Sequence, residues 1–131
     1  MQNILIKAAF EVLLNNSVDM IFLKDINLVY QAASMPFVKM VGKDKVEDVI
    51  GHTDREIFSD SNLASRYETD DRKIISEGRD LLNFIEPITD IDGHPRYGLT
   101  SKYLIWDENG KVLGILGITR DITKEYITRL H

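Results

Sequence analysis

The sequence predicts an α+β fold with strands at both ends of the chain and helices gathered between them. Strand-like segments at residues 20–32 and 81–119 flank a run of helical segments from 36 to 77. This order is typical of an antiparallel sheet whose helices are segregated to one face. The 131 residues, of which 44% are hydrophobic and 28% charged, suit a single compact domain.

The composition excludes several classes of function. A net charge of -5 argues against a nucleic-acid partner, because binding a phosphate backbone requires a basic surface. The absence of cysteine excludes disulfides, thiolate zinc sites and cysteine nucleophiles. No apolar run approaches the roughly 20 residues of a membrane span, and the N-terminus shows no charged leader. We therefore expect a cytoplasmic protein that does not insert into a membrane.

Residues 3–16 are predicted to form an amphipathic helix. Its polar stripe recurs every four residues, at Asn3, Lys7, Glu11 and Asn15. The remaining positions are mostly apolar, and so broad an apolar surface needs cover on more than one side. We expect this helix to cover one face of the sheet, either in its own chain or in a second copy.

A hairpin is predicted to follow this helix. Residues 20–23 and 28–32 read as its strands, and residues 24–27 read as the turn because Asp and Asn side chains bond to nearby backbone groups. Short helices are expected at residues 36–41 and 45–50, each followed by a glycine that permits the left-handed closing conformation.

A longer helix is predicted in the middle of the chain. Thr53 and Glu56 have the spacing of a capping box, and a helix should run from near Asn62 to Glu77 before Gly78 ends it. Its acidic cluster at residues 68–71 is interpreted as a solvent-exposed face.

The last third of the chain is predicted to be a three-stranded meander. Strands at residues 81–91, 96–106 and 111–119 are separated by Asp92-Gly93 and Asn109-Gly110, which are strong hairpin signals. The nearly continuous apolar run from 112 to 118 indicates a strand buried on both faces. A final helix is expected from Lys124 to Leu130.

These elements resemble a PAS domain, the sensory module common in bacterial signalling proteins. The matching stretches are residues 18–33, 51–58 and 92–123, and the closing Asp121-Ile122-Thr123 is the most specific of them. The resemblance implies a five-stranded antiparallel sheet in the order 2-1-5-4-3, with short helices enclosing a pocket on one face. It divides the chain into a flanking helix (1–17), a sensor domain (18–123) and the start of a signalling helix (124–131).

The resemblance also implies partners for this domain. Homodimerisation is expected through the N-terminal helix, and the helix after Thr123 would lead to an output domain, often a histidine kinase or a diguanylate cyclase. The last helix stops at His131 without a closing signal, which predicts a longer parent protein. Asp121 and Thr123 suit a helix start because each can bond to unpaired backbone N–H groups. The resemblance adds a signal-relay role for Asp121, Ile122 and Thr123.

Lys102 is the central candidate for ligand binding. Residues 96–106 alternate between two faces, and the family pattern places Thr100 and Lys102 toward the pocket. A buried ammonium needs a partner, so Lys102 either pairs with Glu86 or Asp54 or extends to the pocket rim. Alternatively it receives an anionic ligand such as a small carboxylate, with Thr100 and Thr119 as further contacts. The predicted ligand-binding set is Lys102, Thr100, Glu86, Asp54, Thr119 and Tyr30.

The sequence does not identify a cofactor. His52, His94 and His131 are scattered and lack the spacing of a metal site. No histidine falls in residues 62–77, where haem-binding relatives carry their iron ligand, and no cysteine is present for flavin-adduct chemistry. Haem and cysteine-adduct flavin are therefore not expected.

Three functions remain open from the sequence. The first is a sensor that binds a small molecule and biases the helix after Thr123. The second is an interaction module that dimerises without a ligand. The third is a small α+β enzyme in which Glu86 or Asp54 acts as general base, for which the sequence offers no further support.

Overall fold

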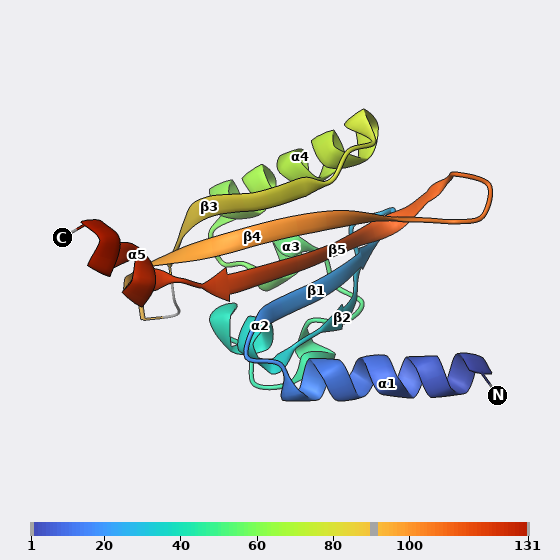
Figure 1. Ribbon diagram of the computed structural model, residues 1–131, viewed down its shortest axis with the longest axis horizontal. Helices are drawn as coiled ribbons and strands as arrows, with labels where there is room; N and C mark the ends of the chain where they lie inside the picture. Colours follow the sequence, from blue (N-terminus) through green and yellow to red (C-terminus); the bar gives the residue numbers. More distant parts are fainter. Residues whose placement is uncertain (1, 90–91, 131) are drawn as a thin grey trace.

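The chain folds into an antiparallel sheet with helices packed against one face (Figure 1). The computed structural model describes residues 2–89 and 92–130. The strands are β1 (Met20–Asp25), β2 (Tyr30–Ala33), β3 (Leu81–Thr89), β4 (Pro95–Trp106) and β5 (Val112–Asp121). The helices are α1 (Gln2–Asn16), α2 (Met35–Met40), the 3-10 helix η1 (Val46–Asp48), α3 (Asp54–Ile57), α4 (Ser61–Glu77) and α5 (Thr123–Leu130).

The five strands lie in the order β2-β1-β5-β4-β3, and every neighbouring pair is antiparallel. This order confirms the predicted topology. The two glycine turns of the meander place Gly93 and Gly110 at φ values of +81° and +80°, which glycine adopts without strain. The predicted strand 81–91 ends on Asp90 and Ile91, which lie outside the described residues.

The alternation of β4 decides which side chains face the helices. Thr100, Lys102 and Leu104 are 1%, 8% and 6% exposed, whereas Tyr103 between them is 37% exposed. The pocket-facing set expected for this strand is therefore confirmed. The core lies between this face of the sheet and the helices, where Val38 and Ile115 are fully buried.

The pairing of β1 with β5 depends on a glycine. Gly117 lies opposite Phe22 in the register, and a Cβ atom at this position would overlap the Phe22 ring. Glycine lets the aromatic ring lie flat over β5 toward the core. Lys102 is the partner of Gly117 on the other side, in β4, so the same gap leaves room beside the lysine stem.

α4 begins and ends at the residues that the sequence indicated, within one position. The Asp60 carboxylate accepts from the backbone N–H groups of Asn62 (3.0 Å) and Leu63 (3.2 Å). Gly78 closes the helix in the left-handed region, at φ +66°. At the start of the preceding helix α3, the Glu56 carboxylate accepts from the Thr53 backbone N–H (3.0 Å), as the capping box requires.

The turn between β1 and β2 begins later than predicted. Lys24 and Asp25 belong to β1, and the turn starts at Ile26. Asp25 still shapes this turn, because its Oδ1 accepts from the backbone N–H groups of Asn27 and Val29. The prediction started the turn at Lys24 because Asp25 and Asn27 suit a turn, whereas the Lys24 side chain is only 2% exposed and is neutralised by buried carboxylates.

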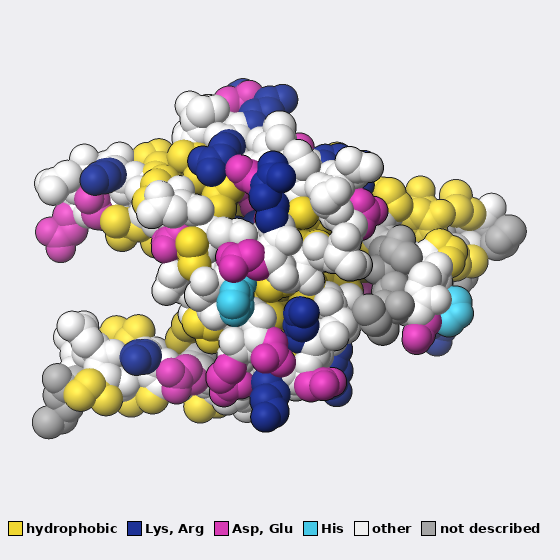
Figure 2. All heavy atoms as spheres, turned by 180° about the vertical axis from the view of Figure 1, so that it is seen from behind, with side chains coloured by type: hydrophobic (Ala, Val, Ile, Leu, Met, Phe, Trp, Pro, Cys, Tyr) yellow, Lys and Arg dark blue, Asp and Glu magenta, His cyan; other side chains and the backbone are white. Residues whose placement is uncertain are grey.

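α1 does not cover the outer face of the sheet in its own chain, which leaves a second copy as the remaining alternative expected for this helix. It runs beside β2, away from β3 and β4 (Figure 1), and only Leu14 of its residues is buried. Apolar side chains remain exposed along its projecting arm (Figure 2, lower left), among them Ile4 at 73%, Leu5 at 69% and Leu13 at 66%. Among the described residues, none of the helices is long and apolar enough to cross a membrane.

Candidate ligand-binding site

Two lysine side chains from different strands enter the core on the helix-covered face of the sheet. Lys24 extends from β1 and Lys102 from β4, with β5 between them. The Lys24 Nζ lies 2.6 Å from both Asp54 Oδ2 and Asp71 Oδ2. The Lys102 Nζ lies 2.6 Å from Asp71 Oδ1. Asp71 therefore bridges the two ammonium groups.

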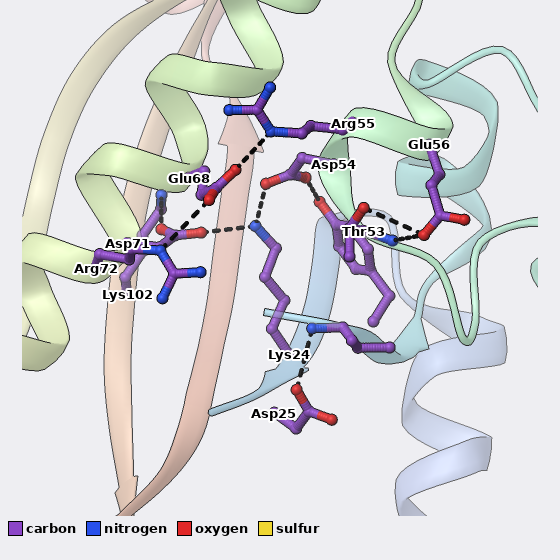
Figure 3. Close-up of polar contacts among 12 residues, drawn as sticks. Lys24, Asp25, Thr53, Asp54, Arg55, Glu56, Glu68, Asp71, Arg72 and Lys102 are labelled. Carbon is purple, nitrogen blue, oxygen red and sulfur yellow. Dashed lines mark hydrogen bonds and ion pairs between the residues drawn. The ribbon is translucent and has the colours of Figure 1, made fainter. Parts of the chain in front are cut away.

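The two carboxylates come from the helices that cover the sheet (Figure 3). Asp54 is the first residue of α3, and Asp71 lies in the middle of α4. They are 3% and 0% exposed, so neither charge is hydrated by bulk solvent. Buried charges are tolerated only when paired and hydrogen-bonded, and this cluster meets that condition. It also ties α3 and α4 to β1 and β4.

Aromatic rings complete the surroundings of the lysines. The Tyr30 hydroxyl donates to Asp54 Oδ1 (2.5 Å), and burial together with the Asp54 charge raises the pKa of Tyr30 well above its usual value. The Lys24 Nζ lies 5.1 Å from the centroid of the Phe22 ring and 4.9 Å from that of Tyr30. Cations at these distances are attracted to the ring faces. Tyr30 stays a neutral hydrogen-bond donor in this environment.

A hydroxyl chain forms the other polar wall. Thr100 Oγ1 donates to Glu86 Oε1 (2.8 Å), so the hydrogen bond between Thr100 and Thr119 (2.8 Å) has Thr119 as its donor. Tyr67 of α4 lies near this wall. Burial, and after it the charge of Glu86, raises the pKa of Tyr67 to about 12.

These groups enclose a cavity of about 40 Å³ between the sheet and the helices. Its polar lining comes from Lys24, Lys102, Tyr30, Tyr67, Glu86 and the two threonines of β4 and β5. Its apolar lining includes Phe22, Phe37, Met40, Phe58 and Ile88. A volume of this size has room for a few water molecules or a ligand of a few atoms.

Five of the six predicted ligand-binding residues line this cavity: Lys102, Thr100, Glu86, Thr119 and Tyr30. The sixth, Asp54, lies behind the lining and holds Lys24 and Tyr30. The partner expected for Lys102 was Glu86 or Asp54, and the structure shows Asp71 instead. The interpretation of Asp71 as solvent-exposed is therefore wrong. Whether these residues bind a ligand stays a prediction.

Sequence reasoning missed both Lys24 and Asp71. A signal existed for each: Lys24 continues the inward alternation of Met20 and Phe22, and Asp71 shares a helical face with Tyr67 and Ile74. Both were overlooked because charged side chains are rarely buried without a partner, and the partners lie 30 to 47 residues away in sequence.

The exit of β5 is linked to β4 by a second polar cluster. Asp121 Oδ1 accepts from the backbone N–H (2.9 Å) and hydroxyl (2.6 Å) of Thr123, and Asp121 Oδ2 accepts from Arg96 Nε (2.5 Å). Thr123 Oγ1 accepts from the Tyr97 N–H (2.9 Å), and the Ile122 N–H donates to the Tyr97 carbonyl (2.9 Å). The start of α5 is thus fixed to β4 as well as to β5.

Metal ligation finds no support in residues 2–89 and 92–130. Within those ranges no group of three or more histidine, aspartate or glutamate side chains could hold an ion. His52 instead lies 3.3 Å from Glu56 on the surface. His131 lies outside the described residues.

The sheet order, the cavity between the sheet and its helices, and the helix that follows β5 define an α+β module with an internal pocket. A family model described as "PAS fold" matches residues 14–127, so the chain belongs to the PAS family. The match begins inside α1 and ends inside α5. A comparison with curated proteins gave no match.

Solved structures share this fold at low sequence identity. VqmA bound to DPO is 24% identical with a TM-score of 0.73, covering 87% of this chain and 57% of that one. A ligand–DNA complex of VqmA from Vibrio cholerae is 23% identical with a TM-score of 0.75, covering 94% and 57%. The PAS domain of BvgS from Bordetella pertussis is 22% identical with a TM-score of 0.75, covering 95% and 94%. The chain thus spans little more than half the length of these VqmA chains.

Proposed function

We propose that this chain is the sensory module of a bacterial signal-transduction protein. It binds a small molecule in the cavity and relays the bound state through a dimer and the C-terminal helix to an output domain, such as a diguanylate cyclase or a histidine kinase. The observation that carries this proposal is the continuity of the cavity wall with the exit helix. Thr119 lines the cavity, and Asp121, two residues later in β5, holds the first residue of α5.

The relay acts through the two strands that contact both the ligand and α5. A ligand that repositions Thr100 and Thr119 shifts β4 against β5. Arg96 and Tyr97, near the start of β4, hold Asp121, Ile122 and Thr123. Such a relay requires the ligand to bind the two states with different affinities. The division into a flanking helix (1–17), a sensor domain (18–123) and a signalling helix (124–131) belongs to this proposal.

The ligand-binding roles of Lys102, Thr100, Glu86, Thr119 and Tyr30 are supported by their place in the cavity wall, and Asp54 contributes by holding Lys24. The ligand-bound VqmA structure supports small-molecule binding by a protein of this fold. The anionic ligand expected from Lys102 receives less support, because Asp71 already neutralises this ammonium.

Mass spectrometry of compounds retained by the purified protein, followed by a thermal-shift screen of metabolites, tests this proposal. A compound that binds only the native state raises the melting temperature. We expect Lys102→Met to reduce the shift and Lys111→Met, which removes an exposed lysine, to leave it unchanged. An equal shift in Lys102→Met would remove Lys102 from the binding site.

A second candidate function is dimerisation without a ligand. The small cavity volume and the exposed apolar side chains of α1 favour it. This alternative is supported if no screened compound changes the melting temperature or the association constant of the dimer.

In the main proposal, the partners of the chain are a second copy and a small molecule. The protein acts in the cytoplasm, with no direct role for nucleic acid or membrane insertion.

The enzyme hypothesis receives the least support. Asp54 is occupied by Lys24 and Tyr30, and Glu86 accepts a hydrogen bond from Thr100. We propose that the module itself senses rather than catalyses, and that any catalysis belongs to an attached output domain. Turnover of a compound by the isolated domain would contradict this.

A further inference from the structure

The charged groups around the cavity include one carboxylate more than ammonium groups. Lys24 and Lys102 are balanced by Asp54 and Asp71, which hold them at 2.6 Å. Glu86 also lines the cavity, and within the described ranges it forms no ion pair. A carboxylate ligand would add a second uncompensated negative charge beside the half-buried Glu86, and like charges at short range repel each other.

One wall of the cavity supplies hydrogen-bond donors. An ammonium group has three N–H bonds. In the described part of the chain Lys24 directs two of them to carboxylates and Lys102 directs one. The remaining N–H groups on these two lysines are available to an acceptor in the cavity.

The other polar wall supplies acceptors. Thr119 donates to Thr100 and Thr100 donates to Glu86, so both hydroxyl protons are already used. In the described part of the chain, the second oxygen of Glu86 and a lone pair of Thr119 accept no further hydrogen bond. Lys102 and Thr100 are two residues apart on one face of β4, so their Cα atoms lie about 7 Å apart and the donors and acceptors lie side by side on the sheet.

We infer that the cavity takes a small neutral molecule that carries both a hydrogen-bond acceptor and a hydrogen-bond donor, such as an amide, in preference to a carboxylate. The acceptor faces Lys102 and Lys24, and the donor faces Glu86 and Thr119. This inference rests on the proposed ligand-binding function. A volume of about 40 Å³ suits a molecule with about four non-hydrogen atoms.

Four probes of the same planar shape and size separate the possibilities: acetamide, acetate, acetamidinium and acetone. Titration of each into the isotopically labelled protein, followed by NMR of backbone amides in β1, β4 and β5, gives its affinity. We expect acetamide to bind about three- to tenfold more tightly than acetate or acetone, the effect of one hydrogen bond. Acetate binding as tightly as acetamide, or acetamidinium binding most tightly, would overturn the inference.

Two cavity variants and one control test which side chains contact the acceptor and the donor of each probe. Glu86→Gln should raise acetate affinity by removing the excess charge, and Lys102→Met should weaken acetamide and acetone alike. Glu108→Gln, at an exposed turn, should change neither. Glu86→Gln keeps the hydrogen-bond acceptor and the size of the side chain, so it remains informative if Lys102→Met fails to fold.

The outcomes distinguish this inference from the function on which it rests. If acetate binds best at the cavity amides, the cavity still binds ligands and only the neutral class is wrong. If none of the four probes shifts these amides, or all shifts lie elsewhere, the ligand-binding function and the neutral class both fail.

Discussion

Asp71 shows how one buried carboxylate connects a helix to two strands. It accepts from Lys24 of β1 and Lys102 of β4 through different oxygens and is fully buried. Each of its two ion pairs adds little to stability, because desolvation offsets the attraction. Its removal is costly for another reason, since in the described part of the chain it leaves Lys102 without its ion-pair partner and Lys24 with Asp54 alone.

We predict that Asp71→Asn lowers the free energy of unfolding by about 3–5 kcal/mol, the range for breaking a buried ion pair by removing one partner. Urea denaturation followed by circular dichroism measures it. Asp70→Asn is the matched control: it changes the exposed neighbour in the same helix and should cost less than about 0.5 kcal/mol. A similar decrease in the free energy of unfolding in both variants would show that Asp71 does not form the buried ion pairs with Lys24 and Lys102.

At the scale of elements, the junction of β5 with α5 is the part most closely tied to signalling. Burial raises the pKa of Asp121, but hydrogen bonds from Arg96 and Thr123 outweigh it and lower the pKa below its usual value of 3.8. A group with a depressed folded-state pKa stabilises the fold above its unfolded-state pKa. That stabilisation is lost as the pH falls through the folded-state pKa.

We therefore predict that Asp121→Ala destabilises the protein by about 1 kcal/mol at neutral pH, through loss of the helix-start contacts. The difference from the wild type should stay constant down to about pH 4 and shrink below it. Urea midpoints measured across pH test this, with Glu108→Ala at an exposed turn as control. A difference that grows on acidification would contradict the depressed pKa.

At the scale of the whole molecule, two apolar surfaces lack cover within one chain. The outer face of the sheet exposes Ile85 (47%), Tyr103 (37%) and Leu113 (49%), and α1 exposes its apolar side chains. Contiguous apolar surface of this kind is typical of interaction sites. A second copy that places its α1 against this face would cover both surfaces, which is the dimer that we propose.

Leu13→Glu tests this dimer. Leu13 is 66% exposed in the single chain, so a charge there should leave the monomer folded and weaken association by about tenfold or more. Sedimentation equilibrium measures the association constant. Asn3→Glu adds the same charge on the polar stripe of α1 and should have little effect. A wild type that is monomeric at high concentration would reject the proposal.

Much of the fold was predictable because its signals are local. The glycine turns, the end of α4 at Gly78 and the alternation of β4 each depend on a few neighbouring residues, and the structure confirms them. Alternation separated the two faces of β4, but it was the family resemblance that placed Thr100 and Lys102 toward the interior, because apolarity alone would put Tyr103 and its neighbours there. The placement of α1 stayed open between its own chain and a second copy, because a broad apolar surface indicates that cover is needed and does not indicate what supplies it.

The sequence by itself determined most of the strands, because they follow from periodicity and turn chemistry. The family resemblance added the strand order and the inward direction of Thr100 and Lys102. Only the tertiary structure decided that Asp71 pairs with both lysines and that Lys24 is buried. The physical reason is that the environment of a charged side chain depends on partners far away in sequence. For the same reason, only the structure shows that Glu86, unlike Asp54 and Asp71, forms no ion pair in the described part of the chain.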